Sequence, residues 1–558
     1  MYKKVLKEIL KIVIKNNVNN QKKLDSLKKE IIKKYKIKKI PTNADILTEA
    51  NSKEREKLKW MGIKPTRTLS GVNVIAIMTK PIPCPHGKCI YCPGGINSYF
   101  GDVPQSYTGK EPATRRAIRN NYDPYLQVFN RLEQYTAINK IPEKVELIIM
   151  GGTFPSFPRK YRESFIGYAF KALNDFSKYF FSRNRLNIKK FNNFFELPGN
   201  IENEKRIRRV QERILKLKGK YDLIKEQKRN ENSKIRCVGL TIETRPDYGK
   251  LKEGNEMLRL GATRVELGIQ SVYDDVLKFI ERGHTIKDSI ESISILKNLG
   301  FKINLHYMLG LIKERKKELH GLKLLFKKQE FRPDMLKLYP CMILKGTKLY
   351  ELWKAGKFKA LTTKQAVSII SEFKKKIIPK FCRIMRVQRD IPTYMTEAGV
   401  DMTNLRQMIN VKCNCIRCRE IGLFMKKHPD YKPRNLELIK RYYKASEGTE
   451  FFISIEDIKN DVLFGFCRLR FPSHFLRKEI TQDSALIREL HVYGEAEKIG
   501  KKGKIQHKGF GKKLLKEAEK ICRTYYKKKI VVISGVGVRN YYKKLGYKQE
   551  GPYMVKGL

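Results

Sequence analysis

Short apolar runs rich in β-branched residues alternate with longer amphipathic segments through the middle of the chain. The runs have the length of strands, and the segments between them are long enough for crossover helices, so we predict an α/β domain with a mainly parallel sheet. Because polar residues follow the ends of these strands, the sheet is expected to form an open or partial barrel. The six predicted strands are residues 72–78, 145–150, 236–242, 264–269, 301–309 and 335–340.

The pattern differs on either side of this domain. Residues 1–70 are lysine-rich, with apolar positions at helical spacing, and are predicted to form basic helices. The long charged stretch 178–234 is interpreted as a basic helical insertion. We therefore expect a basic region at 1–70, the parallel domain at 71–392, a cysteine-rich linker at 393–445 and a C-terminal domain at 446–558.

The C-terminal domain has its own alternation of short strands and helices, which predicts a second, smaller α/β fold. Its expected strands are residues 451–455, 462–471, 486–493 and 530–535, and its expected helices are residues 511–525 and 540–545.

The net charge of the chain indicates that the protein binds a negatively charged partner. Among 558 residues, Lys and Arg number 118 against 57 for Asp and Glu, a formal net charge of +61. A polyanion such as a nucleic acid would screen this charge, with Lys28, Lys29, Lys33 and Lys34 among the residues that could contact phosphates. The alternatives are a composition bias shared by the whole proteome and a membrane surface. No secretory signal and no apolar run approaching ~20 residues is found, which predicts a cytoplasmic protein.

Six of the eleven cysteines lie in two tight groups, a spacing typical of metal ligands in a reducing compartment. Cys84, Cys89 and Cys92 are spaced C-x4-C-x2-C and follow the first predicted strand. Three thiolates on one loop can hold three irons of a [4Fe–4S] cluster and leave the fourth iron open for S-adenosylmethionine. The alternative is a structural zinc site with a fourth ligand such as His86.

The second group places Cys413, Cys415 and Cys418 within six residues. A structural zinc ion takes four ligands, so a zinc site here needs one more. Cys382 is one candidate for that ligand, beside residues that the sequence does not single out. Redox activity and free thiols are the alternatives to zinc.

A glycine-rich turn, Gln506-x-x-Gly509-x-Gly511, precedes the first predicted helix of the C-terminal domain. Glycines there let the backbone approach a pyrophosphate, which the helix N-terminus stabilises. Residues 489–492 form a strand just before it, whose backbone could pair with a pantetheine arm. The order of strand, glycine turn and later strand resembles the GNAT acetyltransferase fold, the alternative being an unrelated α/β domain.

Longer motifs narrow the resemblance. The cysteine loop resembles the radical S-adenosylmethionine (SAM) superfamily, although the common spacing there is one residue shorter, C-x3-C-x2-C. From about residue 64 to the end, the chain is similar to the catalytic acetyltransferase subunit of Elongator, the family of tRNA uridine-34 acetyltransferases, in its archaeal type. The motifs that carry this likeness are Cys92-Pro93-Gly94-Gly95, Gln105-Ser106-Tyr107-Thr108-Gly109, Met150-Gly151-Gly152-Thr153-Phe154 and Val387-Gln388-Arg389-Asp390-Ile391-Pro392.

The resemblance implies site residues. Gly151, Gly152 and Thr153 would meet the amino group of SAM, and Glu243 and Gln270 could contact its methionine or ribose parts. For each residue taken alone, the alternative is a turn glycine or a buried polar side chain whose hydrogen bonds are satisfied within the protein. Lys144 and Tyr542 are the residues expected at the catalytic step. The acetyl-CoA contacts implied by the family are Lys144, Glu489, Leu490, His491, Val492, Phe510, Gly511, Lys512 and Tyr542. The expected partners are tRNA, an electron donor, and a second copy or Elongator-like subunits.

Our hypothesis is that a SAM-derived radical takes hydrogen from the methyl group of acetyl-CoA. The carbon radical then adds to C5 of wobble uridine 34, and thioester hydrolysis leaves 5-carboxymethyluridine. The first rival is a protein lysine acetyltransferase with a structural iron–sulfur domain, for which Glu489 or His491 would be the base. The second is a tRNA-binding scaffold with vestigial catalytic elements.

Overall fold

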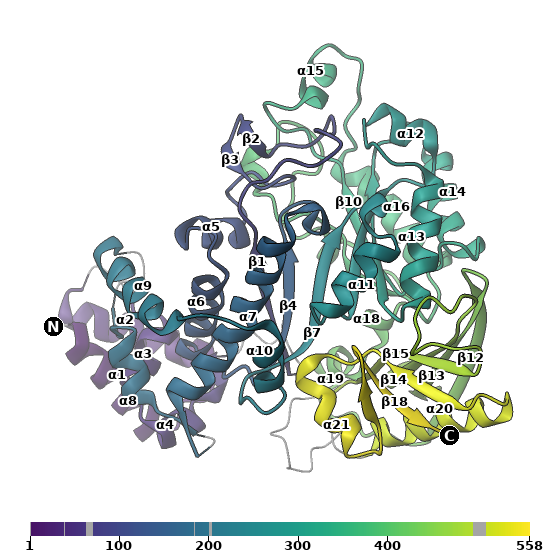
Figure 1. Cartoon of the computed structure of the whole chain (residues 1–558). Helices are drawn as coiled ribbons and strands as arrows, with labels where there is room; N and C mark the ends of the chain where they lie inside the picture. The colour runs from purple at the N-terminus through teal and green to yellow at the C-terminus, as the bar shows by residue number, and fades with distance from the viewer. Residues whose placement is uncertain (1, 38–39, 63–70, 184, 200–202, 495–508) are drawn as a thin grey trace.

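A seven-stranded parallel sheet forms the centre of the protein in a computed structural model (Figure 1), which describes residues 2–37, 40–62, 71–183, 185–199, 203–494 and 509–558. The order of the strands in the sheet is their order in the chain, as in an open barrel wound in one direction. All six predicted strands are confirmed. The strands are β1 (Val72–Met78), β4 (Lys144–Met150), β7 (Arg236–Thr244), β8 (Arg264–Gln270), β9 (Lys302–Leu309), β10 (Met335–Pro340) and β11 (Arg383–Arg386).

The seventh strand, β11, is not among the predicted ones. It has four residues, two of them arginines, so no apolar run marks it, and pairing with β10 defines it as a strand. The helices that follow the other strands pack on the outer face of the sheet and form the main apolar core. These helices are α6 (Pro124–Ala137), α7 (Arg159–Phe180), α11 (Leu251–Arg259), α13 (Ile286–Asn298), α14 (Arg315–Lys327) and α16 (Thr363–Lys376).

The two faces of the sheet have different character. On β4, Val145, Leu147 and Ile149 are fully buried against the helices, whereas Lys144 and Glu146 point to the opposite, inner face. The inner face of the barrel is therefore partly lined by charged side chains, an arrangement that the site uses.

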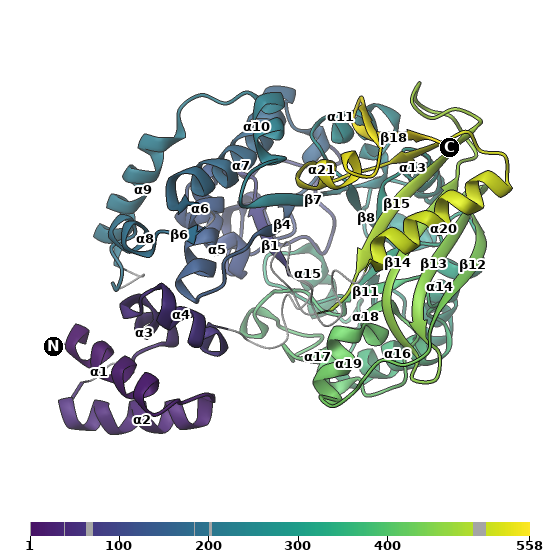
Figure 2. The same ribbon diagram turned by 90° about the horizontal axis from the view of Figure 1, so that it is seen from below.

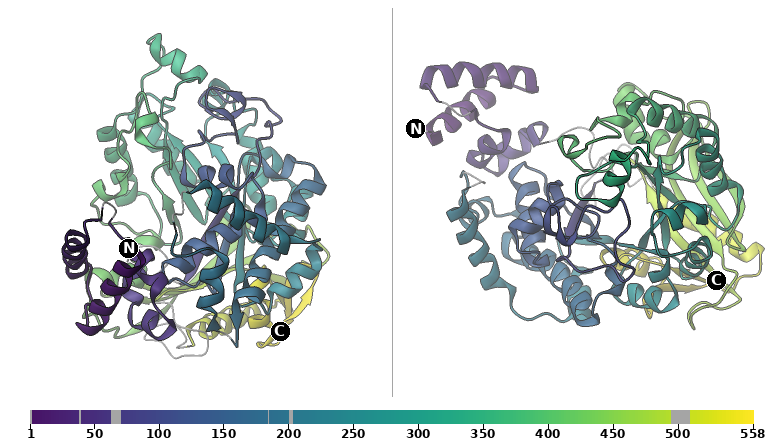
Figure 3. Two further views of the ribbon diagram at one scale, coloured as in Figure 1. Left: turned by 90° about the vertical axis from the view of Figure 1, so that its left-hand side faces the viewer. Right: turned by 90° about the horizontal axis from the view of Figure 1, so that it is seen from above.

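Helices at the N-terminus form a separate small core, which confirms the predicted basic helices. They lie beside the inserted helices α8 and α9, as Figures 2 and 3 show from three sides. The Asn192 side chain of α8 donates to the Thr48 carbonyl at 2.8 Å. The N-terminal helices are α1 (Tyr2–Lys15), α2 (Gln21–Tyr35), α3 (Asn43–Glu49) and α4 (Ser52–Lys57), and the insertion holds β5 (Phe181–Ser182), β6 (Arg185–Leu186), α8 (Ile188–Phe194), α9 (Glu204–Lys218) and α10 (Leu223–Asn230).

The C-terminal domain is a second seven-stranded sheet with helix α20 (Phe510–Thr524) packed on one face. Its strands are antiparallel except for the pair β15–β16. The first strand, β12, falls in the range expected as linker, ahead of residue 446. The strands are β12 (Leu436–Ala445), β13 (Gly448–Asp457), β14 (Val462–Phe471), β15 (Ser484–Val492), β16 (Lys529–Val532), β17 (Lys548–Glu550) and β18 (Tyr553–Gly557).

Smaller elements complete the fold. Four of them lie in the upper part of Figure 1 and follow the carboxyl ends of parallel strands: β2 (Gly95–Ser98), β3 (Gly101–Val103), α12 (Asp274–Phe279) and α15 (Lys348–Lys354). Helix α5 (Pro112–Arg119) lies lower, beside β1. The linker contributes α17 (Leu405–Met408), α18 (Ile416–Arg419) and α19 (Ile421–Lys427), and α21 (Arg539–Lys543) lies in the last domain. In the part of the chain that the structure describes, no helix combines the length and apolar character that crossing a bilayer requires.

The C-terminal domain covers the amino ends of the parallel strands, below the sheet in Figure 1. A fully buried ionic network joins the two domains. Asp334, just before β10, pairs with Arg488 of β15 and lies 3.6 Å from Arg468 of β14. Arg468 in turn donates to Glu489 at 2.9 Å. Because buried charges are stable only when paired, this network fixes how the two domains dock.

Candidate functional site

The first cysteine group lies at the carboxyl end of β1, on the upper edge of the parallel sheet. Cys89 and Cys92 are buried, and Cys84 is half-buried. The backbone N–H of Ser106 donates to Cys92 Sγ at 3.2 Å, and Cys92 Sγ lies 3.1 Å from Gln105 Oε1. The predicted motif at 105–109 therefore forms one wall around the cysteine loop.

The spacing of the sulfurs distinguishes a cluster from a single ion. Thiolates on one tetrahedral zinc lie about 3.8 Å apart, given a Zn–S bond of about 2.3 Å. The Sγ atoms of Cys413, Cys415 and Cys418 all lie within 4.8 Å of one another, but those of the first group do not gather in this way. In a [4Fe–4S] cluster each thiolate binds a different iron, so the wider spacing of the first group fits the cluster better than zinc.

The predicted glycine motif reaches the same place. Gly151 and Gly152 follow β4 with φ of +119° and +105°. A Cβ on Gly151 would lie 2.3 Å from Thr79 Oγ1, and one on Gly152 would lie 3.8 Å from Cys84 Sγ. Thr153 Oγ1 lies 3.5 Å from the same sulfur. The structure thus brings all three motif residues to the cysteine loop, with Gly152 half-buried and its neighbours buried. No side chain at Gly151 or Gly152 would block the close approach of a ligand to the backbone.

Glu243 and Gln270 end the next two strands, β7 and β8, at the same edge. Gln270 is buried with φ of +64°, and its Oε1 has no hydrogen-bond partner among the described residues. Glu243 points into the barrel, where it accepts from Tyr107 at 3.3 Å and pairs with Lys337 at 3.3 Å. Gln270 therefore has free capacity for a ligand, whereas Glu243 is already engaged by protein groups.

Further charges fill the barrel below Glu243. Lys337 pairs with Glu266, which also accepts from His306 Nε2 at 2.8 Å. Arg264 lies 2.5 Å from Glu146, one layer lower. Glu243, Glu266 and His306 come within 4.8 Å of one another, but the Lys337 ammonium occupies the position that a cation would need. Apart from Glu243, these lumen residues were not indicated by any sequence motif.

At the lower edge, β15 supplies the predicted acetyl-CoA strand. It pairs with β16 only over Ser484–Ile487, so residues 489–492 have β14 on one side and no strand on the other among the described residues. The pairing with β14 shifts register near Arg488. Because of this bulge, the neighbouring residues Arg488 and Glu489 both reach the ionic network below the barrel. The open strand edge can pair with the amides of pantetheine.

The start of α20 lies against this open edge. A Cβ on Gly511 would be 3.9 Å from Val492 and 4.0 Å from Leu490. The N-cap residue, Gly509, has φ of +80° and makes no side-chain cap, so the first N–H groups of α20 have no capping side chain. A pocket beside it is lined by Gly509, Lys512, Lys513, Lys516 and Lys520, among other residues. Predicted residues Phe510, Gly511 and Lys512 therefore form a positively charged helix start suited to phosphates. Residues 506–508 of the glycine turn lie outside the described residues.

The charge of Lys144, at the start of β4, acts on His491 of the C-terminal domain. Burial lowers the pKa of His491 to about 4, with Glu489 opposing the shift and Arg383, Lys302 and Lys144 adding to it. His491 Nε2 is buried without a partner among the described residues. Burial, followed by the neighbouring charge of Arg236, also lowers the pKa of Lys144. In the sheet Lys144 pairs with Arg236, and a Cβ on Gly537 of the C-terminal domain would lie 2.6 Å from the Cβ of Arg236. Lys144 therefore begins its strand at the domain interface, and among the features of the sequence only the family resemblance indicated it.

Tyr542 is buried on α21, between the rings of Tyr541 and Tyr547 at 5.3 and 5.6 Å. The hydroxyl of Tyr541 would lie 3.0 Å from a Cβ on Gly511. Tyr541 therefore reaches the start of α20 directly, a contact that the sequence analysis did not single out.

The second cysteine group has the spacing of a single-ion site, at the start of α18. Hydrogen bonds from Cys413 and Cys418 hold the pKa of Cys415 well below its ordinary value. Cys382 is fully buried nearby, where its carbonyl accepts from Ile416 N, but its thiol does not join the group of three. The three cysteines fit a zinc ion, which we propose here, with a fourth ligand other than Cys382.

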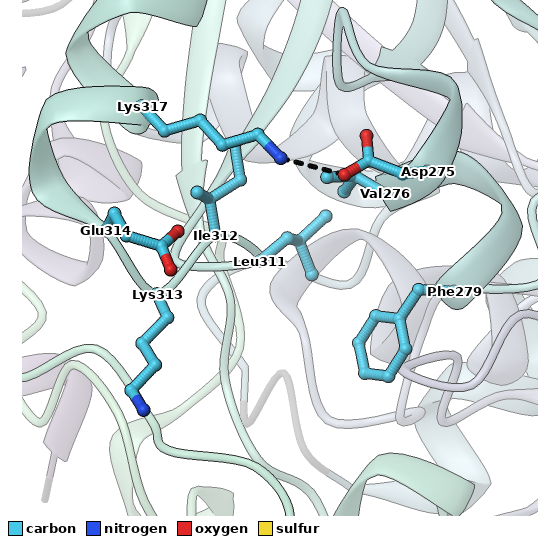
Figure 4. A pocket seen from close by; sticks show the side chains of 8 residues that line it. All are labelled: Asp275, Val276, Phe279, Leu311, Ile312, Lys313, Glu314 and Lys317. Carbon is cyan, nitrogen blue, oxygen red and sulfur yellow. Dashed lines mark hydrogen bonds and ion pairs between the residues drawn. The ribbon is translucent and has the colours of Figure 1, made fainter.

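A shallow surface pocket lies between α12 and the loop that follows β9 (Figure 4). Asp275 and Lys317 close one side of it with an ion pair of 2.8 Å, and Leu311 and Ile312 form its floor. None of the predicted site residues lines this pocket. Beneath the loop, buried Glu318 accepts from Gly310 N at 2.8 Å.

Glu318→Gln is expected to stabilise the protein in a pH-dependent way. Burial raises the pKa of Glu318 to about 7, above its value in the unfolded chain. At low pH the protonated carboxyl is compatible with its buried site, but as the pH rises through 7 the group ionises and destabilises the folded protein. Glutamine stays neutral at every pH and avoids this loss. The gain in unfolding free energy of the variant should be roughly 1–3 kcal/mol larger at pH 8 than at pH 5. Urea denaturation at both pH values measures this, and an equal gain at both would contradict it.

Comparisons with known proteins follow the same division of the chain. Family models match in sequence order: the ELP3 N-terminal domain at residues 2–69, the radical SAM superfamily at 81–325, its C-terminal domain at 333–415 and the GNAT acetyltransferase family at 420–547. A tRNA uridine(34) acetyltransferase of Methanocaldococcus infernus is 42% identical over 99% of this chain and 98% of its own. Elongator complex protein 3 of Schizosaccharomyces pombe is 40% identical, and the match covers 99% of this chain and 97% of the relative.

The chain belongs to the Elongator complex protein 3 family. A solved structure, the archaeal Methanocaldococcus infernus Elp3 with an N-terminal deletion, superposes with a TM-score of 0.70 at 38% identity, covering 88% of this chain and all of that one. The radical SAM and GNAT domains of this family member imply sites for a [4Fe–4S] cluster, SAM and acetyl-CoA. The cysteine loop and glycine motif at the upper edge of the barrel suit the cluster and SAM, and the open strand and helix start at the lower edge suit acetyl-CoA.

Proposed function

We propose that this protein is a cytoplasmic enzyme that forms 5-carboxymethyluridine at wobble uridine 34 of tRNA, with acetyl-CoA as the source of the two added carbons. The names of its relatives, tRNA uridine(34) acetyltransferase among them, support the substrate. The observation that carries the proposal is the placement of two sites at the two ends of one barrel. The cysteine loop and glycine motif lie at the carboxyl ends of the strands, and the open half of β15 lies beneath their amino ends.

At the upper edge, Cys84, Cys89 and Cys92 would hold three irons, and the Gly151–Gly152 backbone would face the amino group of SAM. When bound, the cluster and SAM supply an organic radical able to remove hydrogen from a carbon atom. The hydrogen would come from the methyl group of acetyl-CoA, and the carbon radical so formed would add to C5 of uracil. C5 is a carbon atom, so an ordinary acetyl transfer to an amine would not modify it. A base in an anticodon loop can be turned out of its stack to reach a recessed site.

At the lower edge, the open backbone of 489–492 would pair with pantetheine, and the N–H groups at the start of α20 would bind the pyrophosphate. Alternate side chains of this strand point to opposite faces. Leu490 and Val492 pack toward α20, whereas Glu489 faces the ionic network under the barrel. The thioester would then lie at the entrance to the lumen, next to Lys144.

Positive charge for binding tRNA is available on the N-terminal helices. Lys29 and Lys33 are exposed on α2 and free to contact phosphates. Lys28 is different from what the sequence indicated, because it is buried and donates to Asn43 at 2.6 Å. Lys34 is exposed but forms an ion pair with Glu8 at 2.9 Å. Contacts to phosphate would orient the tRNA without reading its sequence.

The rival activity, acetylation of a protein lysine, needs a base that can take a proton from an amine near neutral pH. Although burial alone would raise it, the pKa of Glu489 is lowered by Lys302, Arg468 and His491. His491, with its pKa lowered to about 4, is also a weak base at pH 7. Glu489 and His491 are therefore both weak bases for removing a proton from a lysine amine.

Lys144→Met is expected to weaken acetyl-CoA binding about tenfold or more, because a charge-assisted hydrogen bond contributes about 1.5–3 kcal/mol. Lys189→Met, which removes an exposed lysine from α8, serves as the matched control and should leave the affinity unchanged. Isothermal titration with acetyl-CoA measures both. Equal affinity of the two variants would exclude Lys144 from the site.

The function is tested by anaerobic incubation of the reconstituted protein with tRNA, SAM, dithionite and methyl-deuterated acetyl-CoA. Mass spectrometry should find deuterium in both 5′-deoxyadenosine and a carboxymethylated uridine. Absence of both products, with iron content verified and tRNA intact, would contradict the proposal. Acetylated lysine formed without SAM or reductant would support the rival instead.

A further inference from the structure

The segment 280–284, between α12 and α13, forms a second wall of the cysteine loop. Ile90 N donates to the Ile280 carbonyl at 3.2 Å. A Cβ on Gly283 would lie 2.7 Å from the Cβ of His86. This segment is about 190 residues from the cysteines in the chain, yet its backbone is packed directly against them.

Arg282 extends from this wall to a cluster cysteine. Its Nη1 lies 3.5 Å from Cys89 Sγ, while its Nη2 and Nε donate to the Gly268 carbonyl at 2.8 and 3.3 Å. The side chain is buried. A Cβ on Gly268 would lie 2.7 Å from Arg282 Nη2, so the glycine leaves the space that the guanidinium fills. Two bonds to one carbonyl thus aim the third N–H group at the sulfur.

The charge of Arg282 lacks a carboxylate partner among the described residues, within 4.0 Å of its nitrogens. Buried arginines elsewhere in the fold, Arg470 and Arg488, each pair with an acidic side chain. An unpaired buried charge is costly, and arginine does not lose its proton in proteins. The anionic neighbours of Arg282 are the cysteine sulfurs, so its charge is balanced when Cys89 is a thiolate bound to metal.

We infer that Arg282 sets the reduction potential of the iron–sulfur cluster by donating a hydrogen bond to the Cys89 thiolate. Hydrogen bonds to cluster sulfurs and nearby positive charge favour the reduced, more negative state. Arg282 thereby raises the reduction potential of the buried cluster, which makes its one-electron reduction more favourable. This inference rests on the assignment of the cluster to Cys84, Cys89 and Cys92, and Arg282 acts through Cys89 as a positioning residue.

The test compares Arg282→Gln and Arg282→Lys with the unmodified protein after reconstitution with iron and sulfide. Arg55→Gln is the matched control, because Arg55 is also buried, donates to the Thr136 carbonyl and lies in the N-terminal region. Iron content is measured first, and the midpoint potential is then obtained by redox titration followed by electron paramagnetic resonance.

We expect Arg282→Gln to retain iron and to lower the equilibrium constant for one-electron reduction about tenfold, a shift of about 59 mV to more negative potential. Arg282→Lys should shift less, and Arg55→Gln should not shift. An unchanged potential in Arg282→Gln would overturn the inference. Loss of iron from both Arg282 variants would also overturn it, since the residue would then be structural. Absence of iron from the unmodified protein would overturn the cluster assignment itself.

Discussion

Replacing Cys92 by alanine is expected to abolish formation of 5′-deoxyadenosine and of modified uridine. The Cys92 thiol is buried between Gln105 and Ser106, and alanine at this position supplies no atom that could bind iron. A cluster held by two remaining cysteines has neither its full ligand set nor a defined open iron. Iron content, 5′-deoxyadenosine and nucleoside composition measure the three expected losses.

Cys237→Ala is the matched control for this experiment. Cys237 is equally buried, but it lies within β7 and donates to the Gly239 carbonyl, away from both cysteine groups. Its loss removes a small side chain from the core and should leave iron content and activity near those of the unmodified protein. Full activity in Cys92→Ala would contradict the site, whereas equal losses in both variants would show a general effect of removing buried thiols.

The second large effect is expected at the domain interface. Asp334→Asn should lower the free energy of unfolding by about 3–5 kcal/mol, because it removes one carboxylate from a buried network. Arg488 would keep only Glu450 and Arg468 only Glu489 as acidic partners, which leaves an excess of buried positive charge. The carboxylate also accepts from Ile303 N at 2.8 Å, so the new amide nitrogen would face a donor whichever way it turns. Calorimetry and urea denaturation measure the loss, and a change below about 1 kcal/mol would contradict it.

Acid should reveal the same contribution. Burial by itself raises the pKa of Asp334, but Arg488, Arg468 and Lys297 bring it below its ordinary value. A carboxyl group whose pKa is lower in the folded protein than in the unfolded chain stabilises the fold at any pH above its unfolded pKa of about 3.9. This stabilisation is lost as the pH falls below that pKa toward the folded one. The difference between the variant and the unmodified protein should therefore shrink toward low pH.

Glu204→Gln provides the comparison for an exposed pair. Glu204 and Arg208 lie 4.0 Å apart on α9, with side chains 85% and 78% exposed. Water screens such a pair, so the expected change is about 0–0.5 kcal/mol. The contrast with Asp334 separates the effect of burial from that of losing one acidic charge.

The two α/β domains could be predicted from the amino-acid sequence, because strand-length apolar runs and amphipathic spacers are local features of the chain. The sequence also identified the cysteine loop, the Gly151–Gly152 turn and the start of α20, where the chemistry depends on residues close together in sequence. Their metal and cofactor roles rest on a combination of spacing and family resemblance. Strand β11 was missed because four residues with two arginines carry no apolar pattern.

Contacts between residues far apart in the chain depend on the packing of the folded protein and could not be predicted. Arg282 reaches Cys89, and Tyr541 reaches the start of α20, through packing of segments that share no local pattern. The lumen pair Lys337–Glu266 and the interface pair Asp334–Arg488 each join separate strands or domains. A buried charge gives no signal in a single sequence, because its partner is chosen by the fold. Exposure is decided in the same way, as Lys28 packs against Asn43 while the neighbouring Lys29 faces solvent.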